Sequence, residues 1–344
     1  MTASSLASAS AEDATHTTGR GLRSWTLTHD GRLASGLTPR EIAAARAAHA
    51  PLWVDLDVTD QHQVACLENL FGFHPLAVED TLNPQSRVKI EEFPEYLFLI
   101  VRGVTYRHDT EDPYDIETYN LCFFLGRGFL VTTHAGRAVP IEEMVDRVTR
   151  SPDVLGRGAE RMLHAVVDAA VDDYFPVMDQ VDELLDGLEE RVVKSFDESA
   201  LGDILSLKRL VLSLRRHLAP QREVLAVLTN RPNALLTPEM QVYFRDVYDH
   251  VLRINDNLDT YRDLLSSTLD SYLSQVSIRL GRITTGLSVV ATLSVPFVVI
   301  SGMWGMNFEQ IPLSHAPHGF WWMLALQLGL GAALVALLKW RRWL

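Results

Sequence analysis

Two long apolar stretches near the end of the chain constrain its fold more than any other feature. No residue between Arg282 and Glu309 carries a formal charge, and a second uncharged stretch runs from there to Leu338. Their apolar cores, residues 283–303 and 320–338, each have the ~20 residues that a helix needs to cross a bilayer core of ~30 Å. We therefore predict two transmembrane helices, at about 283–304 and at 320–338.

The charges that flank these two segments predict their orientation. The connecting loop, 305–319, contains no Lys or Arg. Basic residues lie instead before the first segment and after the second: Arg279, Arg282, Lys339, Arg341 and Arg342. By the positive-inside rule, both ends and the basic tail 339–344 are cytoplasmic and the loop is external, as in a multi-pass protein of the inner membrane. Two crossings cannot enclose a pore, so a channel built from this chain requires a ring of identical subunits in the lipid bilayer.

The rest of the chain is acidic. Asp plus Glu number 44 and Lys plus Arg 31, which gives a formal net charge of −13. This balance argues against nucleic acid as a partner, because phosphate backbones are bound by clustered Lys and Arg. It suits a surface that meets cations. Residues 1–20 are rich in Ala, Ser and Thr and lack the apolar run of a signal peptide, so we expect a disordered leader.

Residues 21–157 predict an α/β cytoplasmic domain. Short apolar runs predict strands at 52–56, 96–104, 121–125 and 129–133. Helical patterns lie between them, at 60–71 and 74–81. From about residue 158 the pattern changes to long helices. A strongly acidic helix is predicted at 159–196 and a basic one at 201–228, so that 158–236 forms a set of acidic and basic stalk helices.

A third long helix is predicted from 237 to 304. Apolar residues recur in it at alternating spacings of three and four, which is a heptad seam: Phe244, Val247, Val251, Ile254, Leu258, Tyr261 and Leu265. No helix-stopping sequence separates this seam from the first membrane segment. One helix over the whole range would be on the order of 100 Å long, and it would include the first membrane crossing.

Gly305, Met306 and Asn307 follow the first membrane segment directly, and Phe308 comes after them. With the stretches FGFHPLAVEDTLN (71–83), VKIEEFPEYLFLI (88–100), VDDYF (171–175), YFRDVYDH (243–250) and KWRRWL (339–344), this motif resembles the CorA family of magnesium/cobalt transporters. The resemblance covers residues 53–344. It implies a funnel-shaped homopentamer whose first membrane helix lines a pore, and a transporter rather than an enzyme.

The resemblance implies that Gly305, Met306 and Asn307 form the selectivity filter at the outer mouth. A ring of Asn307 side chains would offer neutral oxygens to the water shell of Mg²⁺, which holds its water strongly. Glu309 in the loop would attract cations to the mouth. The implied pore lining, spaced by three or four residues, is Gly281, Thr284, Leu287, Ala291, Val295, Val298 and Gly302. Leu287 and Val295 would form hydrophobic constrictions. The family often has bulkier residues at Gly281 and Thr284 and usually Tyr at Trp304, so the location of the gate stays open.

The resemblance also implies a set of regulatory carboxylates in the cytoplasm. Asp80 and Asp246 would meet across a subunit boundary and bind Mg²⁺, and Glu79 and Asp168 would complete a neighbouring site. A divalent cation bridges carboxylates that otherwise repel one another. High internal Mg²⁺ would then hold the ring closed, and its loss would let the pore open.

Three alternatives remain. The first is a Zn²⁺ transporter of the same fold, which His315 and His318 in the loop would favour, whereas Met306 favours Mg²⁺ with Co²⁺ and Ni²⁺ as further ions. The second is a membrane-anchored enzyme, against which the chain has no Gly-rich phosphate loop, no GxSxG and no HExxH. The third is a scaffold that oligomerises through its heptad helix.

Overall fold

The computed structural model describes residues 22–106, 114–194, 197–306, 312 and 316–341. The chain divides into two compact units. The first unit runs to Leu188 and includes Gly202–Ser266, and the second contains Glu189–Leu201 and Ser267–Leu344. Three helices contribute residues to both units: α8 (Tyr174–Lys194), α9 (Ala200–Asn230) and α10 (Pro238–Trp304).

The first unit contains all the strands of the described chain. The strands are β1 (Arg23–Leu27), β2 (Leu33–Ser35), β3 (Leu52–Asp57), β4 (Lys89–Glu92), β5 (Tyr96–Tyr106), β6 (Ile116–Gly126) and β7 (Phe129–His134). The helices are α2 (Pro39–Ala47), α3 (Gln61–Asn69), α4 (Pro75–Leu82), α5 (Val139–Arg150), α6 (Asp153–Gly156), α7 (Ala159–Asp172), α8 (Tyr174–Lys194), α9 (Ala200–Asn230), α10 (Pro238–Trp304) and α11 (Gly319–Trp340).

The strands form one mixed sheet in the order β2-β1-β3-β7-β6-β5-β4. Only β3 and β7 are parallel neighbours, with Val54 opposite Val131. β5, β6 and β7 follow one another as antiparallel hairpins. The predicted α/β class is thus confirmed, and the four predicted strands lie within β3, β5, β6 and β7.

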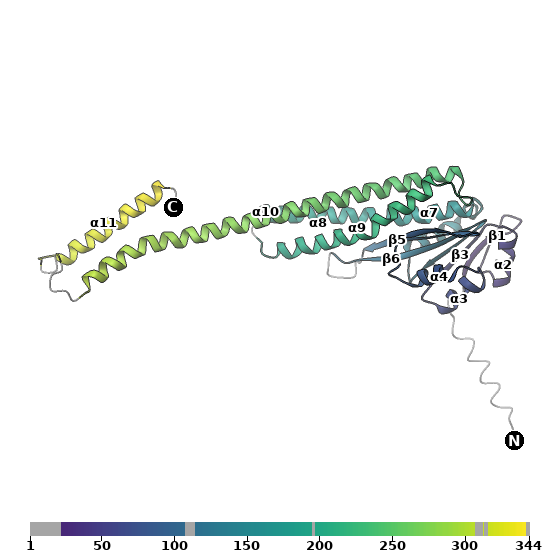
Figure 1. Ribbon diagram of the computed structural model, residues 1–344, viewed down its shortest axis with the longest axis horizontal. Helices are drawn as coiled ribbons and strands as arrows, with labels where there is room; N and C mark the ends of the chain where they lie inside the picture. The colour runs from purple at the N-terminus through teal and green to yellow at the C-terminus, as the bar shows by residue number, and fades with distance from the viewer. Residues whose placement is uncertain (1–21, 107–113, 195–196, 307–311, 313–315, 342–344) are drawn as a thin grey trace, which may run out of the picture. The chain divides into compact units, whose positions relative to one another are not determined.

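Helices cover both faces of this sheet (Figure 1). On one face, alternate strand residues such as Val54, Phe98 and Phe124 pack with Ile42 of α2 and Leu67 of α3 in a continuous apolar core. α7 packs on the same sheet through β5, β6 and β7, and α5 packs on α7. Because successive strand residues point to opposite faces, sheet residues buried on both sides require such a three-layer arrangement.

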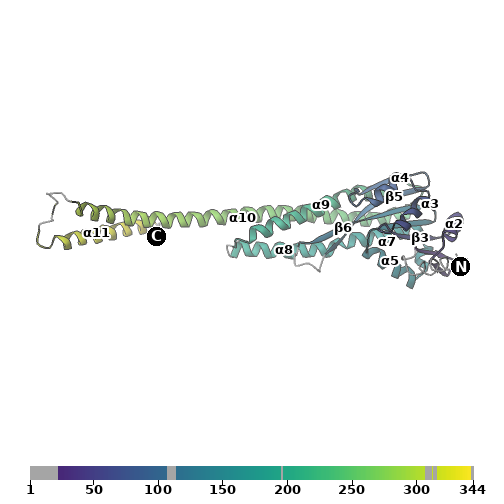
Figure 2. The same ribbon diagram turned by 90° about the horizontal axis from the view of Figure 1, so that it is seen from below.

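Within the first unit, α8, α9 and the first part of α10 run side by side (Figures 1 and 2). Every residue of the heptad seam from Phe244 to Leu265 is buried. The Tyr261 hydroxyl donates to the Met178 carbonyl of α8 at 3.4 Å, and Arg215 of α9 pairs with Asp259 at 3.1 Å. The seam therefore packs against helices of the same chain.

The predicted helix 159–196 is divided into α7 and α8, with Asp173 between them. Pro176 lies in the first turn of α8, where it has no N–H to donate to the preceding turn. Tyr174 is fully buried, and its hydroxyl donates to the Arg102 carbonyl of β5 at 3.0 Å. The break thus follows from a missing backbone donor and from an anchor to the sheet.

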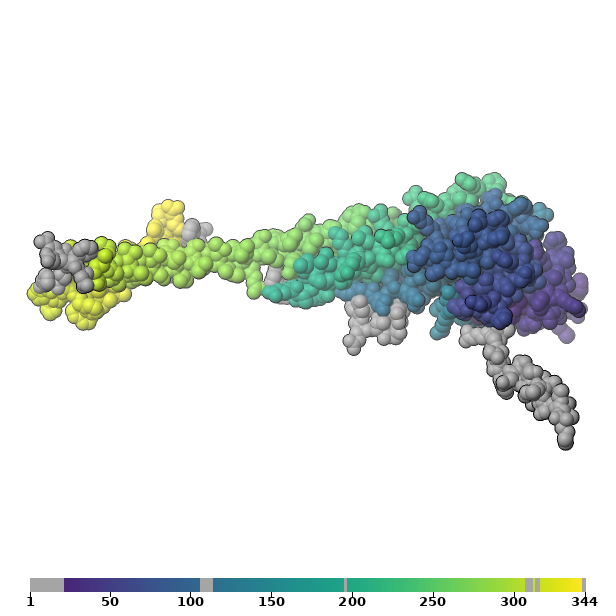
Figure 3. All heavy atoms as spheres, turned by 60° about the horizontal axis from the view of Figure 1, so that its bottom comes forward, coloured from purple at the N-terminus to yellow at the C-terminus, as the bar shows by residue number. Residues whose placement is uncertain are grey.

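The second unit consists mainly of the later part of α10 and of α11. Both helices contain a window that is long and apolar enough to cross a membrane, with mean hydropathy 2.0 and 1.9. Only 6% and 11% of those windows are buried within the chain. On the face drawn in Figure 3, the membrane part of α10 lies largely uncovered by other described elements of its unit.

Candidate functional site

The described part of the Gly305-Met306-Asn307 motif continues the last turn of α10. The Gly305 amide donates to the Ser301 carbonyl at 3.0 Å and to the Gly302 carbonyl at 3.2 Å. The Met306 amide donates to the Met303 carbonyl at 3.4 Å, so the helix tightens as it ends. Asn307 and Glu309 lie outside the described residues, as does His315.

The residues proposed to line a pore all lie exposed on α10. Leu287 and Val298 are each 70% exposed and Val295 57%. The smaller members of the set are also exposed: Gly281, Thr284, Ala291 and Gly302. Ile283 and Val299 are comparably exposed on other sides of the helix. These residues are therefore free to contact a neighbouring copy. Their exposure alone does not distinguish a side chain that faces a pore from one that faces lipid.

α11 covers a different side of α10. The buried residues of α11 are Gln327, Gly331 and Leu338. The Gln327 side-chain amide donates to Ser301 Oγ at 2.7 Å and to the Phe297 carbonyl at 3.4 Å. None of the proposed lining residues takes part in these contacts.

Asp80, on α4, is already paired within its own chain. Lys89 Nζ donates to Asp80 Oδ2 at 2.6 Å and to Glu91 Oε1 at 2.8 Å, and the Ser86 hydroxyl donates to Asp80 Oδ1 at 3.2 Å. Burial lowers the pKa of Lys89, but its hydrogen bonds to the two carboxylates outweigh burial and raise that pKa. Any cation that binds Asp80 therefore competes with Lys89, whereas the neighbouring Glu79 is exposed.

Asp168, on α7, lies in a cluster that the sequence analysis did not identify. One ligand atom each from Asp168, Asp172 and His250 lie within 4.8 Å of one another. His250 Nδ1 is 3.3 Å from Asp172 Oδ1 but makes no hydrogen bond of good geometry. Carboxylates and an imidazole at this spacing are a set of divalent-cation ligands. The i, i+4 spacing of the two aspartates on one helix was the available signal.

The electrostatics of this cluster favour a cation. Burial raises the pKa of Asp168, the histidines His164 and His250 oppose that rise, and Asp172 and Asp246 add to it. A bound cation would supply the positive charge that two adjacent carboxylates lack. Asp246, on α10, is exposed and close enough to act on Asp168 electrostatically.

The structure therefore brings together only part of the proposed regulatory set within one chain. Asp168 and Asp246 interact electrostatically. Among the described residues of a single chain, no hydrogen bond or ion pair joins Glu79 or Asp80 to Asp168 or Asp246.

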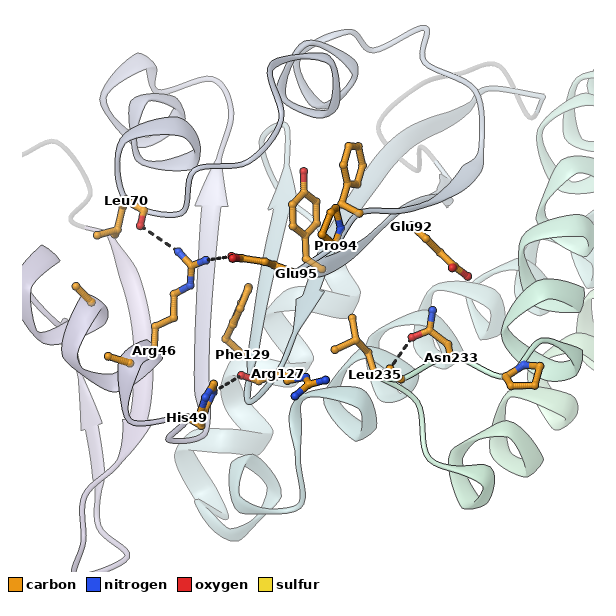
Figure 4. Close-up of a pocket in the computed structure, with 16 residues that line it drawn as sticks. Arg46, His49, Leu70, Glu92, Pro94, Glu95, Arg127, Phe129, Asn233 and Leu235 are labelled. Carbon is orange, nitrogen blue, oxygen red and sulfur yellow. Dashed lines mark hydrogen bonds and ion pairs between the residues drawn. The ribbon is translucent and has the colours of Figure 1, made fainter.

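A separate cavity of about 740 Å³ lies at one end of the sheet, between α2, two strand turns and the α9–α10 loop (Figure 4). Arg46 crosses it, donating to the Phe71 carbonyl at 2.9 Å and to Glu95 at 3.1 Å. Leu235 and Asn233 line the opposite side. None of the proposed ion-binding residues lines this cavity.

Comparisons with known proteins agree with this architecture. The "Cobalt/magnesium transport protein CorA" of Thermotoga maritima is 31% identical over 303 residues, 87% of this chain and 85% of that protein. The "Zinc transport protein ZntB" of Yersinia enterocolitica is 23% identical over 313 residues, 88% of this chain and 91% of that protein. The solved "complete structure of CorA magnesium transporter from Methanocaldococcus jannaschii" matches with a TM-score of 0.80 at 21% identity, covering 92% of this chain and 97% of that one. The family model "CorA-like Mg2+ transporter protein" matches residues 49–341, and we conclude that the chain belongs to this family.

Proposed function

We propose that this chain forms a homopentameric channel that carries hydrated Mg²⁺ into the cytoplasm, with Co²⁺ and Ni²⁺ as further ions. The observation that carries the proposal is the family match over residues 49–341, combined with Gly305-Met306-Asn307 at the outer end of a membrane-spanning helix. Membership in a transporter family also argues against the membrane-anchored enzyme and the scaffold.

The pore of the proposed channel is lined by α10. Its face from Thr284 to Gly302 is apolar or small and carries no charge, so it holds a hydrated ion weakly. Asn307 provides neutral oxygens to the water shell at the mouth, and Glu309 raises the local cation concentration. A ring of carboxylates at the filter would bind the ion harder and release it more slowly.

Regulation in this proposal occurs at the carboxylates of the first unit. Mg²⁺ binds Asp246 with Asp80 of a neighbouring copy, and Asp168 with Glu79, and so favours the closed ring. The raised pKa of Asp168 beside Asp172 supports a cation at that position. The ion shifts the equilibrium only by its higher affinity for the closed state.

The test is Mg²⁺ uptake into proteoliposomes loaded with a fluorescent Mg²⁺ dye. Asn307→Ala is expected to abolish uptake while leaving the oligomer intact by size-exclusion chromatography. Gly329→Ala is the control, because a methyl group there meets no atom within 4 Å. Persisting Mg²⁺ uptake in Asn307→Ala would contradict the proposed filter.

The regulatory part is tested by loading the vesicles with high internal Mg²⁺. Wild type is expected to close, and Asp246→Ala to continue uptake. Asp249→Ala is a matched control, since Asp249 is also an exposed aspartate of α10, three residues away. If both variants close as wild type does, Asp246 is not part of the sensor.

Zinc remains a second candidate cargo, favoured by the ZntB relative that matches 88% of this chain. The same vesicles loaded with a Zn²⁺ dye separate the two candidates. Zn²⁺ uptake without Mg²⁺ uptake by well-folded wild type would replace the magnesium assignment and leave the fold unchanged.

A further inference from the structure

Gln327 is an uncommon residue for its position. Residues 319–338 of α11 contain one side-chain amide, that of Gln327, and no charged side chain. Gln327 is only 7% exposed. A polar side chain in a membrane-spanning segment is costly unless it finds a partner there.

Both partners of Gln327 lie in the outer part of α10. Its Nε2 donates to Ser301 Oγ at 2.7 Å and to the Phe297 carbonyl at 3.4 Å. The first distance is that of a good hydrogen bond, and the second is at the long end of the range. The contact with Ser301 therefore carries most of the interaction.

Ser301 connects this contact directly to Gly305, the first residue of the Gly305-Met306-Asn307 motif. Its side chain accepts from Gln327, while its backbone carbonyl accepts from the Gly305 amide at 3.0 Å. Pro296 lies just before this segment and cannot donate to the carbonyl of the preceding turn. The turn from Thr292 to Pro296 thus lacks one backbone hydrogen bond, so the segment from Pro296 to Gly305 is joined less firmly to the rest of α10, and α11 supplies a second attachment.

A packing contact one turn away on α11 supports the same attachment. A Cβ placed on Gly331 would lie 2.6 Å from Cζ of the Phe297 ring, so the absence of a side chain there admits the ring. Phe297 is therefore held by its ring at Gly331 and by its carbonyl at Gln327. Small residues that admit a neighbour, together with interhelical hydrogen bonds, are the two means by which membrane helices associate.

We propose that Gln327 is a positioning residue for ion passage. It holds the last turns of α10 so that Gly305 and Met306 keep a fixed height along the helix axis and a fixed rotation about it. The inference rests on the proposed function of this motif as an ion filter. Gln327 does not touch the ion; it acts through Ser301. A small displacement of the filter changes how well neutral oxygens match a water shell, so the selectivity among divalent cations changes with it.

The first experiment measures Mg²⁺ and Co²⁺ uptake in proteoliposomes for wild type, Gln327→Met, Ser301→Ala and the double variant. Gln327→Met keeps the length of the side chain and removes its donors. We expect Mg²⁺ uptake to fall about threefold to tenfold and the Mg²⁺-to-Co²⁺ ratio to change. Ser301→Ala is expected to add no further loss in the Gln327→Met background, because the two residues act through one hydrogen bond. Gly329→Ala is the control on the same helix.

The second experiment does not depend on ion flux. Gly302→Cys, beside Ser301, is modified from outside by a membrane-impermeant thiol reagent, with and without Gln327→Met. The native Cys66 and Cys122 lie in the first unit, and a Cys66→Ser background removes the more accessible one. We expect Gln327→Met to change the modification rate at least about threefold.

A purely stabilising role is distinguished by thermal melting of the detergent-purified oligomer. If Gln327→Met lowers the melting temperature but leaves the uptake ratio and the thiol-modification rate of the Gly302→Cys variant unchanged, the positioning role is overturned. If wild type carries no divalent cation at all, the proposed function fails. The modification rate then still decides whether Gln327 positions the end of α10.

Discussion

The central sheet and the membrane-spanning helices bury their apolar side chains to very different extents within one chain. Trp53, Phe98 and Phe124 on the sheet are fully buried, whereas Leu287 and Val298 on α10 are each 70% exposed. The two regions also differ in the polar side chains that they bury. The sheet buries a network that includes charged side chains, whereas the described membrane segments of α10 and α11 bury one side-chain amide, that of Gln327.

This difference shows which part of the fold one chain completes by itself. The sheet is covered on both faces by helices of the same chain, so its stability is set by the packing described above. The chain itself buries little of the apolar windows in the later part of α10 and in α11, so we expect lipid or other copies to cover them. Substitutions in the two regions should therefore differ in what they change.

The largest expected effect is on stability, in the sheet core. Phe124→Ala should lower the free energy of unfolding by about 3–5 kcal/mol, because it leaves a cavity among fully buried rings. Leu287→Ala, on α10, should change it by less than about 0.5 kcal/mol. Denaturant unfolding of the detergent-purified protein compares them. Equal losses in both variants would mean that Leu287 is as well packed as Phe124.

The next effect concerns the buried polar network at the end of β3 and β7. Asp55 accepts from Arg23 Nε at 2.9 Å and from the Thr132 hydroxyl at 2.5 Å, and it lies 3.2 Å from His134 Nε2. Asp55→Asn should cost about 2–3 kcal/mol, because it removes the fully buried carboxylate that pairs with Arg23 and accepts from Thr132.

The control for this network is an exposed ion pair of the second unit. Arg191 pairs with Asp197 at 2.6 Å, and both side chains are partly exposed. Asp197→Asn should therefore change the unfolding midpoint much less than Asp55→Asn does. If the two substitutions cost the same, burial is not what strengthens the Asp55 network.

A smaller effect of opposite sign is expected at Asp173, between α7 and α8. Burial raises its pKa to about 6, and the nearby Glu143 and Asp172 add to the rise. The ionised form is thus disfavoured in the folded state; the penalty is absent below the unfolded pKa of about 4 and is complete above about 6. Asp173→Asn should stabilise the protein by about 1–2 kcal/mol at pH 7.5 and by nothing near pH 4. Melting curves at the two pH values measure this, and a gain that is equal at both would rule out the charge as its cause.

The smallest expected effect on stability is at the contact between α11 and the later part of α10. Gly331→Ala places a methyl group against the Phe297 ring and should cost about 0.5–1 kcal/mol, because the end of a side chain can move aside. Gly329→Ala, with open space around it, should cost nothing measurable. Thermal melting in detergent compares the two glycines. Identical melting temperatures would show that α11 does not pack on α10 through Gly331.

Some elements were predictable because their signals are local. β5 and β7 begin with apolar runs, YLFLIV and FLV, and the two membrane segments have the length and lack of charge that a bilayer imposes. β1, β2 and β4 were missed, because they are short and only partly buried. β6 begins at Ile116, before its apolar run, because its first residues pair with β5 while remaining partly exposed.

The candidate site divides in the same way. The i, i+4 spacing of Asp168 and Asp172 can be read from the chain, but the addition of His250 depends on how α10 packs beside α7. The pairing of Asp80 with Lys89 likewise depends on the turn that brings β4 back to α4. The roles of these carboxylates in regulation stay predictions.

By itself, the sequence determined the α/β class, the long helices and the two apolar segments, since each is written in the periodicity or charge of neighbouring residues. Only the tertiary structure decided the division at Asp173, the Asp168–His250 cluster and the attachment of Gln327 to Ser301. These depend on contacts between residues far apart in the chain, which no local pattern specifies. Such contacts depend on how whole helices and strands pack together, and this packing is determined by the fold of the entire chain.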